Sequence, residues 1–414
     1  MRTYLTLLAT WMVLSLLARP AAGQPALREY VTRYYVIHTD LGEDLVREAA
    51  ARMTAMAEEY HQRTRSFSGT IRRPFPFYLF ARQGDYLAAG GHAGTVGMYV
   101  GDGKKGKLMA LGSLPGYRLW YVVQHEGFHQ FANVVIGDLP VWLNEGLADY
   151  FGVALWTGDG FATGFVPPDK LARVRWMIQN DQLLPFGEML AISNTAWRSR
   201  GDTRHYDQAW SMVHFLVHGE DGRFQAGLSA FIAAVAKGQD RQSAWSANLP
   251  GAAIFQKRYS DWWLAQDLDP SRLVWRKATV ATLTSYVARA TQQGLRLEKA
   301  EEFFAAAGEG KIANLPSAWL PPSLLARALK SAQRDKGWSL TNRSSPQANN
   351  GKAKTAPATT APSPGAGKTA PAPAAPVLVL QLDDGTTFRG TFSIAKERIE
   401  TQVTVEKPKG PKGK

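Results

Sequence analysis

The sequence predicts an α+β protein in which a mixed β-sheet comes first and helices follow it. Segments rich in β-branched and aromatic residues lie in the first part of the chain, up to residue 112. Beyond residue 118, apolar residues recur mainly at helical spacing, as far as residue 336. Strands followed by helices are typical of the α+β class. With 414 residues and 45% hydrophobic content, the chain can bury a large core.

Residues 1–23 have the pattern of a secretory signal peptide. Arg2 precedes an apolar run from Tyr4 to Leu17, and the small-residue stretch "RPAAGQ" follows, with cleavage expected after Gly23. This run is shorter than the ~20 residues that cross a bilayer, which favours cleavage over an uncleaved anchor. The chain has no cysteine, and export without disulfides suits a bacterial envelope. We expect a secreted or periplasmic protein with no stable membrane insertion after cleavage.

The first expected elements form the mixed sheet. The stretch "TRYYVIHT", 32–39, has the composition of a strand, and 40–64 continues as a helix with apolar residues at helical intervals. The stretch "FPFYLFA", 75–81, is a second strand. Residues 97–112 are expected to form two short strands joined by a Gly and Lys turn.

Helices are expected from residue 118 onward. A helical pattern ends at Gly137, and a second helix restarts with Asp138 and Pro140 as start signals. Three more helical patterns follow at 206–218, 224–238 and 255–266. We assign 30–268 to the main domain and 269–341 to a helical extension.

The last part of the chain changes composition. Residues 342–376 are rich in Ala, Pro, Thr, Lys and Gly, which predicts a disordered linker. Residues 377–406 alternate apolar and polar side chains around a "DDG" turn, which predicts a small β module. The basic stretch 407–414 is expected to be a disordered tail.

The net charge of +13 does not indicate a nucleic-acid partner. The basic residues are spread along the chain instead of lining one helix face. From Asn342 onward there are 11 Lys or Arg against 5 acidic residues, so this tail contributes much of the excess. We interpret the charge instead as favouring contact between the basic tail and anionic polymers of the cell envelope.

The stretch "QHEGFHQ" carries the strongest chemical pattern. Residues four apart share one helix face, so His125 and His129 can offer two imidazoles to one tetrahedral zinc ion. Glu126 would lie beside the ion and could take a proton from an attacking water. The next helix supplies Glu145 as a third ligand, and Asp149, four residues on, is placed to hold His125.

Together, "HEGFH" and "LPVWLNEGLADYF" resemble the gluzincins, the branch of zincin metallopeptidases that includes thermolysin and the aminopeptidase N group. The resemblance is greatest to the peptidase MA-like proteins of bacterial envelopes, and it covers roughly 32–266. It implies a thermolysin-like catalytic domain, Zn²⁺ as cofactor and a peptide or protein as substrate. It also implies that His125, His129 and Glu145 are the zinc ligands. Glu126 would be the general base, and Asp149 would be a carboxylate that orients a ligand.

The resemblance has further implications for packing and substrate. Gly146 and Ala148 match small positions at which the two helices pack closely, and "KLMALG" matches the sheet edge where an extended substrate would add as a strand. The counterpart of the aminopeptidase amine-binding segment is "VGMYVG", which has no glutamate. An endopeptidase is therefore favoured over an aminopeptidase.

The stretch "YDQAWSMVHFLVH" resembles the aminopeptidase helix whose first tyrosine supports the oxyanion, which makes Tyr206 the favoured donor. The chain departs from that pattern at Gln208 and Ala209, and His205 is the competing donor. His214 and His218 also lie four apart, but apolar neighbours favour core histidines over a second metal site.

These observations predict an exported zinc-dependent peptidase. One alternative is a catalytically inactive, zinc-bearing binding or scaffold protein of the envelope, because a fold and a metal do not fix activity. Another is an envelope interaction protein in which the β module and basic tail carry the function.

Overall fold

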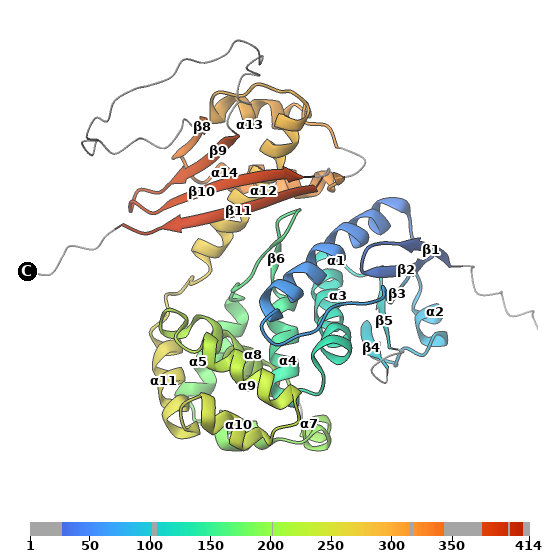
Figure 1. Cartoon of the computed structure of the whole chain (residues 1–414), viewed down its shortest axis with the longest axis vertical. Coiled ribbons are helices and arrows are strands. Elements are labelled where there is room, and N and C mark those ends of the chain that lie inside the picture. The colour runs from blue at the N-terminus through green and yellow to red at the C-terminus, as the bar shows by residue number, and fades with distance from the viewer. Residues whose placement is uncertain are drawn as a thin grey trace, which may run out of the picture.

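The computed structural model describes residues 27–101, 106–200, 202–314, 318–342, 375–395 and 398–408. The expected signal peptide, nearly all of the expected linker and most of the basic tail lie outside these residues. The described chain is a mixed α+β structure with two parts (Figure 1). The first holds a five-stranded sheet with helices α1 to α11, and the second holds a four-stranded sheet with α12 to α14.

The five-stranded sheet has the order β1-β2-β3-β5-β4. Its strands are β1 (Arg28–Val31), β2 (Tyr35–Thr39), β3 (Phe75–Phe80), β4 (Gly97–Val100) and β5 (Lys107–Leu111). Strands β2, β3 and β5 are parallel, whereas β1 and β4 pair antiparallel at the two edges.

The sequence placed "KLMALG" at the edge of this sheet, and that prediction is wrong. The corresponding strand, β5, lies between β3 and β4, and Leu108 to Leu111 are buried. A run of consecutive apolar residues is typical of a parallel strand buried on both faces. The edge strand on this side of the sheet is β4, the "GMYV" strand.

Two long helices pack against the sheet and against each other. Helix α1 (Glu43–Thr64) and helix α3 (Gly116–Phe131) share the main core with Tyr35, Phe77 and Val123. The short α2 (Gln83–Ala88) contacts the inner strands β3 and β5. After Phe131 the helix widens into one π turn, η1 (Ala132–Ile136), and ends at Gly137, whose φ of 116° favours glycine.

The remaining helices of the first part pack around α4 (Val141–Gly152) and α8 (Thr203–His218). Glycines allow close contact here: a Cβ on Gly146 would lie 2.5 Å from the Ala209 carbonyl oxygen of α8. The other elements are β6 (Leu155–Trp156), β7 (Phe161–Ala162), α5 (Pro168–Gln179), α6 (Phe186–Ala191), α7 (Asn194–Arg200), η2 (Gly219–Gly222), α9 (Gln225–Ala236), α10 (Arg241–Asn248) and α11 (Ala252–Leu264).

The second part is a single sheet and helix unit. It contains α12 (Arg272–Gln292), α13 (Ala300–Gly308), α14 (Pro322–Ala332), β8 (Trp338–Asn342), β9 (Pro376–Gln381), β10 (Thr387–Ala395) and β11 (Arg398–Glu406). The strands pair antiparallel in the order β11-β10-β9-β8, and α12 packs across them (Figure 1).

Here the structure corrects the division drawn from the sequence. Residues 338–341 were expected to belong to a helical extension, and 377–406 to a separate β module. In the structure the first segment is a strand that pairs with β9, and Val280 of α12 contacts Leu380 and Phe388 of the sheet. A small sheet needs such a cover, because it cannot bury its apolar face alone.

The two parts meet through the β6–β7 hairpin. Asp159, at the hairpin tip, makes a bidentate ion pair with Arg289 of α12, at 3.0 and 3.1 Å, and it also accepts a hydrogen bond from Ser285. Arg289 is 1% exposed, so this pair lies inside the junction. Within the described ranges, none of the helices has the length and apolar character needed to cross a membrane.

Candidate metal centre

Three side chains from two neighbouring helices converge at one point. His125 and His129 project from α3, and Glu145 projects from α4. The two Nε2 atoms lie 3.1 Å apart, and Glu145 Oε2 lies 3.5 Å from the first and 3.4 Å from the second. These three groups can hold a metal ion.

The spacing of these atoms fits a tetrahedral ion. Ligands at the usual zinc distance of ~2.0–2.1 Å lie about 3.3 to 3.4 Å from one another at the corners of a tetrahedron. The observed separations bracket that value. Two imidazoles and one carboxylate are also an attested donor set for catalytic zinc.

Gln124 ties the two ligand helices together. Its side-chain amide nitrogen lies within hydrogen-bonding distance of the carbonyl oxygens of Phe151, Gly152 and Ala154, at the end of α4. The backbone carbonyl oxygen of Gln124 accepts a hydrogen bond from the Tyr60 hydroxyl of α1, at 2.6 Å. Because Gln124 precedes His125, these bonds fix the backbone that carries the first ligand.

Asp149 holds His125, as the spacing predicted. Its Oδ1 lies 2.9 Å from His125 Nδ1 and accepts a hydrogen bond from the Tyr121 hydroxyl at 2.5 Å. This contact directs His125 Nε2 toward the other ligands. Burial alone would raise the pKa of Asp149, but hydrogen bonds and charge from His125 and Lys170 lower it well below its usual value.

The ligand groups themselves have strongly shifted pKa values. Burial opposes ionisation of Glu145, yet hydrogen bonds with His125 and His129 lower its pKa to about 2. Burial likewise opposes protonation of His125, but Asp149 and Glu145 raise its pKa well above the usual value. The carboxylates of Glu145 and Asp149 therefore favour positive charge next to them.

A second charged network lies behind Asp149 and was not predicted from the sequence. Lys170 of α5 donates to Asp149 Oδ2 at 2.8 Å and to Asp207 Oδ1 at 2.9 Å. Arg173, one turn later, also pairs with Asp207, which lies on α8 beside Tyr206. Lys170 thus joins the helix of the third ligand to the helix of the expected oxyanion donor.

Glu126 points toward the edge of the five-stranded sheet. Its Oε2 accepts a hydrogen bond from the backbone N–H of Tyr99 on β4, at 2.8 Å. Glu126 and His125 line an open cavity of about 720 Å³, together with Gly97 of β4 and Tyr206 of α8. The predicted general base, one predicted ligand and the sheet edge therefore share one cavity.

Tyr206 and His205 lie differently. Tyr206 belongs to the cavity lining, and burial followed by the charge of Glu145 raises its pKa. His205 does not belong to that lining; its Nδ1 lies 3.0 Å from Asp202, the residue that caps α8. The geometry favours Tyr206 as the donor on the cavity side.

The other histidines lie apart from this centre. His214 is buried and contacts the Gly164 carbonyl oxygen, and His218 lies 2.9 Å from the Tyr150 hydroxyl. Among the described residues, the group formed by the two ligand histidines and Glu145 is the one that could hold an ion. His92 lies exposed in a loop.

Comparison with known proteins gives one similarity. The profile of a family described as a protein of unknown function (DUF1570) matches residues 121–236. The matched span contains the three residues of the metal cluster together with Glu126 and Tyr206. A search of curated proteins gave no match.

Proposed function

We propose that this protein is a zinc-dependent peptidase with a zincin-type catalytic domain. The observation that carries the proposal is the convergence of His125, His129 and Glu145, with His125 and the adjacent Glu126 lining an open cavity. A catalytic zinc site needs three protein ligands and one open position. A purely structural site would be closed by a fourth protein ligand.

The choice of zinc follows from the donors. Two imidazoles and one carboxylate, with tetrahedral spacing and no thiolate, suit zinc better than the oxygen-rich sites of calcium or magnesium. When bound, zinc supplies a Lewis acid that polarises a carbonyl group and lowers the pKa of water.

The protein residues would divide the remaining work. Glu126 would accept the proton of the attacking water and pass it to the leaving amine, and the Tyr99 amide would keep its carboxylate in place. The Tyr206 hydroxyl would donate a hydrogen bond to the developing oxyanion. Asp149 would fix the ring of His125.

A peptide is the substrate that best suits the cavity. Strand β4 is the edge of the sheet, and Gly97 at its start lines the cavity beside Glu126. An exposed strand edge can bind an extended peptide through backbone hydrogen bonds. We propose an endopeptidase, because a strand-like mode does not require a free substrate terminus.

The test is metal analysis combined with peptide-library cleavage. We expect the chain without residues 1–23 to bind one zinc ion and to cleave peptides. Glu126→Gln should retain zinc and lose about 10² to 10⁴ in kcat, because it keeps the shape but cannot accept a proton. The control is Glu188→Gln, which changes an exposed glutamate on α6 and should leave both readouts unchanged.

Two outcomes would contradict the proposal. Equal cleavage by wild type and Glu126→Gln would remove the catalytic assignment. Stoichiometric zinc without cleavage by wild type would favour a zinc-bearing binding or scaffold protein of the cell envelope.

A further inference from the structure

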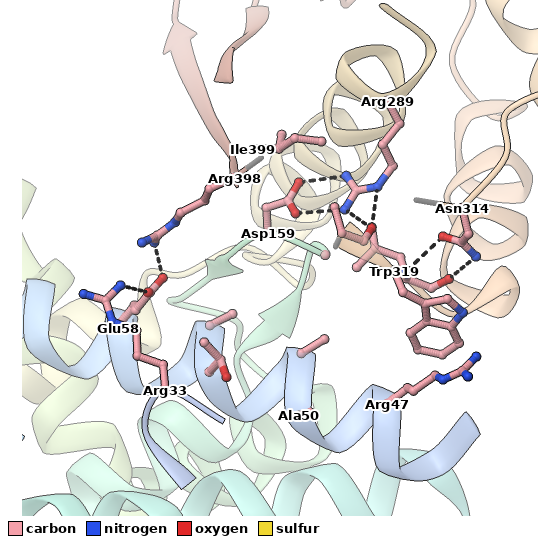
Figure 2. A pocket seen from close by; sticks show the side chains of 16 residues that line it. Arg33, Arg47, Ala50, Glu58, Asp159, Arg289, Asn314, Trp319, Arg398 and Ile399 are labelled. Atoms are coloured by element: carbon pink, nitrogen blue, oxygen red, sulfur yellow. Dashed lines mark hydrogen bonds and ion pairs between the residues drawn. The ribbon is translucent and has the colours of Figure 1, made fainter. Parts of the chain in front are cut away.

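A second cavity, of about 870 Å³, lies where the two parts of the chain meet (Figure 2). One wall is a face of α1, and the opposite wall comes from the β6–β7 turn, α12, the segment before α14 and β11. On α1 the lining residues recur at helical spacing between Arg47 and Glu58, mostly as Ala and Thr. These short side chains leave a groove along the helix.

Arginines lie at both ends of the groove, each beside at least one carboxylate. Figure 2 shows Arg47 beside Trp319 at one end, and Arg33 and Arg398 meeting Glu58 at the other. Arg47 pairs with Glu43 at 3.3 Å, and Arg33 with Glu58 at 3.3 Å, while each of these arginine side chains stays more than half exposed. Most of their N–H donors therefore face solvent.

The carboxylates of the groove are already engaged. Glu58 faces two guanidinium groups, those of Arg33 and Arg398. Asp159 is held by Arg289, whose own donors are used by Asp159, Ser285 and the Ala318 carbonyl oxygen. A ligand would therefore meet partly exposed arginine N–H donors at both ends, where Glu43, Glu58 and Glu400 offset part of the charge. Such donors favour carboxylates or other oxyanions.

The middle of the groove is apolar. The accessible apolar surface comes from Ala50 and Ala51 of α1 and from Trp319, which are partly exposed, whereas Leu320 and Ile399 in the same lining are 1% and 3% exposed. A ligand with anionic groups at its ends and an apolar middle matches this lining. A bare phosphate chain would leave the apolar walls without a partner.

The length of the groove further restricts which ligands fit it. Arg47 and Glu58 are eleven positions apart, so the α1 wall is about 16 Å long at the helical rise per residue. An extended peptide advances ~3.3 Å per residue, so about five residues fill it. We propose that this groove binds an extended acidic peptide segment of another protein, with carboxylates toward Arg47 and toward Arg33 and Arg398.

The chain itself does not supply this peptide. Its long segments outside the described residues, 1–26, 343–374 and 409–414, contain basic residues and no Asp or Glu. They would be repelled by the arginines of the groove. The groove also shares no lining residue with the metal cavity, so the proposal stands whether or not the protein is a peptidase.

Fluorescence anisotropy can test this binding in the Glu126→Gln chain, where cleavage does not interfere. The probe is a labelled pentapeptide with Glu at both ends and Ala-Leu-Ala between them, compared with the same peptide carrying Lys at both ends. We expect saturable binding of the acidic probe alone, weakened by salt. The double variant Arg33→Glu/Arg47→Glu should lower its affinity at least about tenfold, because two charge-assisted contacts become repulsive.

A matched double variant separates the groove from overall charge. Arg82→Glu/Arg241→Glu changes the net charge equally, at arginines just before α2 and at the start of α10 that pair with Asp85 and Asp138. We expect it to lower affinity less than about threefold, since it acts only through screened long-range charge.

Three results would overturn the proposal. They are absence of saturable binding to the wild-type groove, equal losses in the two double variants, and tighter binding of tripolyphosphate than of the peptide. The last result would assign the groove to phosphate ligands instead.

Discussion

Asp149 is 1% exposed and contacts side chains from two helices, with His125 and Tyr121 on α3 and Lys170 on α5. Its charge both orients His125, a candidate metal ligand, and offsets the partly buried ammonium of Lys170. Carboxylates in this position usually change metal affinity by 10- to 100-fold when replaced.

We therefore expect Asp149→Asn to weaken zinc binding about 10- to 100-fold, because a neutral amide accepts a weaker hydrogen bond from the imidazole N–H and does not neutralise Lys170. Competition with a chelator measures the affinity. Asp169→Asn is the control, since Asp169 is an exposed carboxylate paired with Arg173. Unchanged zinc affinity in Asp149→Asn would show that His125 is held in another way.

His214 should make the stability of the protein sensitive to acid. Burial, followed by the nearby His218, lowers its pKa to about 3. The folded state favours the neutral ring, whereas the unfolded chain takes up a proton below its ordinary pKa of ~6.5. This contribution to stability is therefore complete above that pH and is lost as the pH falls toward about 3.

Replacing His214 with Gln should flatten this dependence. Between about pH 7 and pH 5, the free energy of unfolding should change by roughly 2 kcal/mol less in the variant than in wild type. Urea unfolding at the two pH values measures the difference. The exposed His92→Gln serves as control, and an unchanged pH dependence in His214→Gln would show that the ring is not buried neutral.

Sequence reasoning at this level found the residues that follow a local spacing. His125, His129, Glu145 and Asp149 follow intervals of four within two adjacent helices, so pattern alone could assemble them. Lys170 could not be found in this way, because its partners Asp149 and Asp207 lie on two other helices. Only the packing of α4, α5 and α8 brings these groups together.

Between helices, Gly146 controls how closely α4 approaches α8. A Cβ at this position would lie 2.5 Å from the Ala209 carbonyl oxygen and 2.7 Å from Val213 Cγ2. The first contact is with backbone, which cannot turn aside. Glu145, the third member of the candidate metal cluster, is the preceding residue, so a shift of α4 would move it.

Gly146→Ala should therefore destabilise the fold by about 1 to 3 kcal/mol and weaken zinc binding. Gly187→Ala in α6 is the control, because a Cβ there has nothing within 4 Å, and it should be neutral or stabilising by at most ~1 kcal/mol. Thermal unfolding and zinc titration measure the two effects. Equal behaviour of the two variants would contradict close packing at Gly146.

Helices were more predictable than strand partners. Periodicity placed α1, α3 and α8 within a few residues, and the start signals at Asp138 and Pro140 placed α4, which is buried on nearly all sides. Strand order is set by long-range pairing, so the sequence could not show that β4 and not β5 forms the edge. Strand β8 was missed for the same reason, since its partner begins at Pro376.

The stability of the second part of the molecule depends on its last three strands, β9 to β11. Leu378, Leu380 and Phe388 are fully buried, and the latter two contact Val280 of α12. A chain that ends at residue 342 would leave this face of α12 in water. At about 1.5 to 3 kcal/mol for each buried apolar side chain, the loss is on the order of 5 kcal/mol.

We expect the chain ending at residue 342 to lose cooperative unfolding of this part and to aggregate, whereas a chain ending at residue 408 should behave as wild type. Thermal unfolding and gel filtration distinguish the two. A well-folded, monomeric short chain would show that α12 does not need the sheet. The groove beside α1 also depends on the fold of the whole chain, because residues between 33 and 399 line it.

The pairing of β8 with β9 has a consequence for limited proteolysis. These neighbouring strands are joined by residues 343–375, yet their five paired positions hold them side by side without that connection. A cut anywhere in the connecting stretch would thus produce two polypeptides that co-elute as one particle and separate only in denaturant. After the two polypeptides have been separated, the C-terminal fragment could be added back to the N-terminal one to restore the particle.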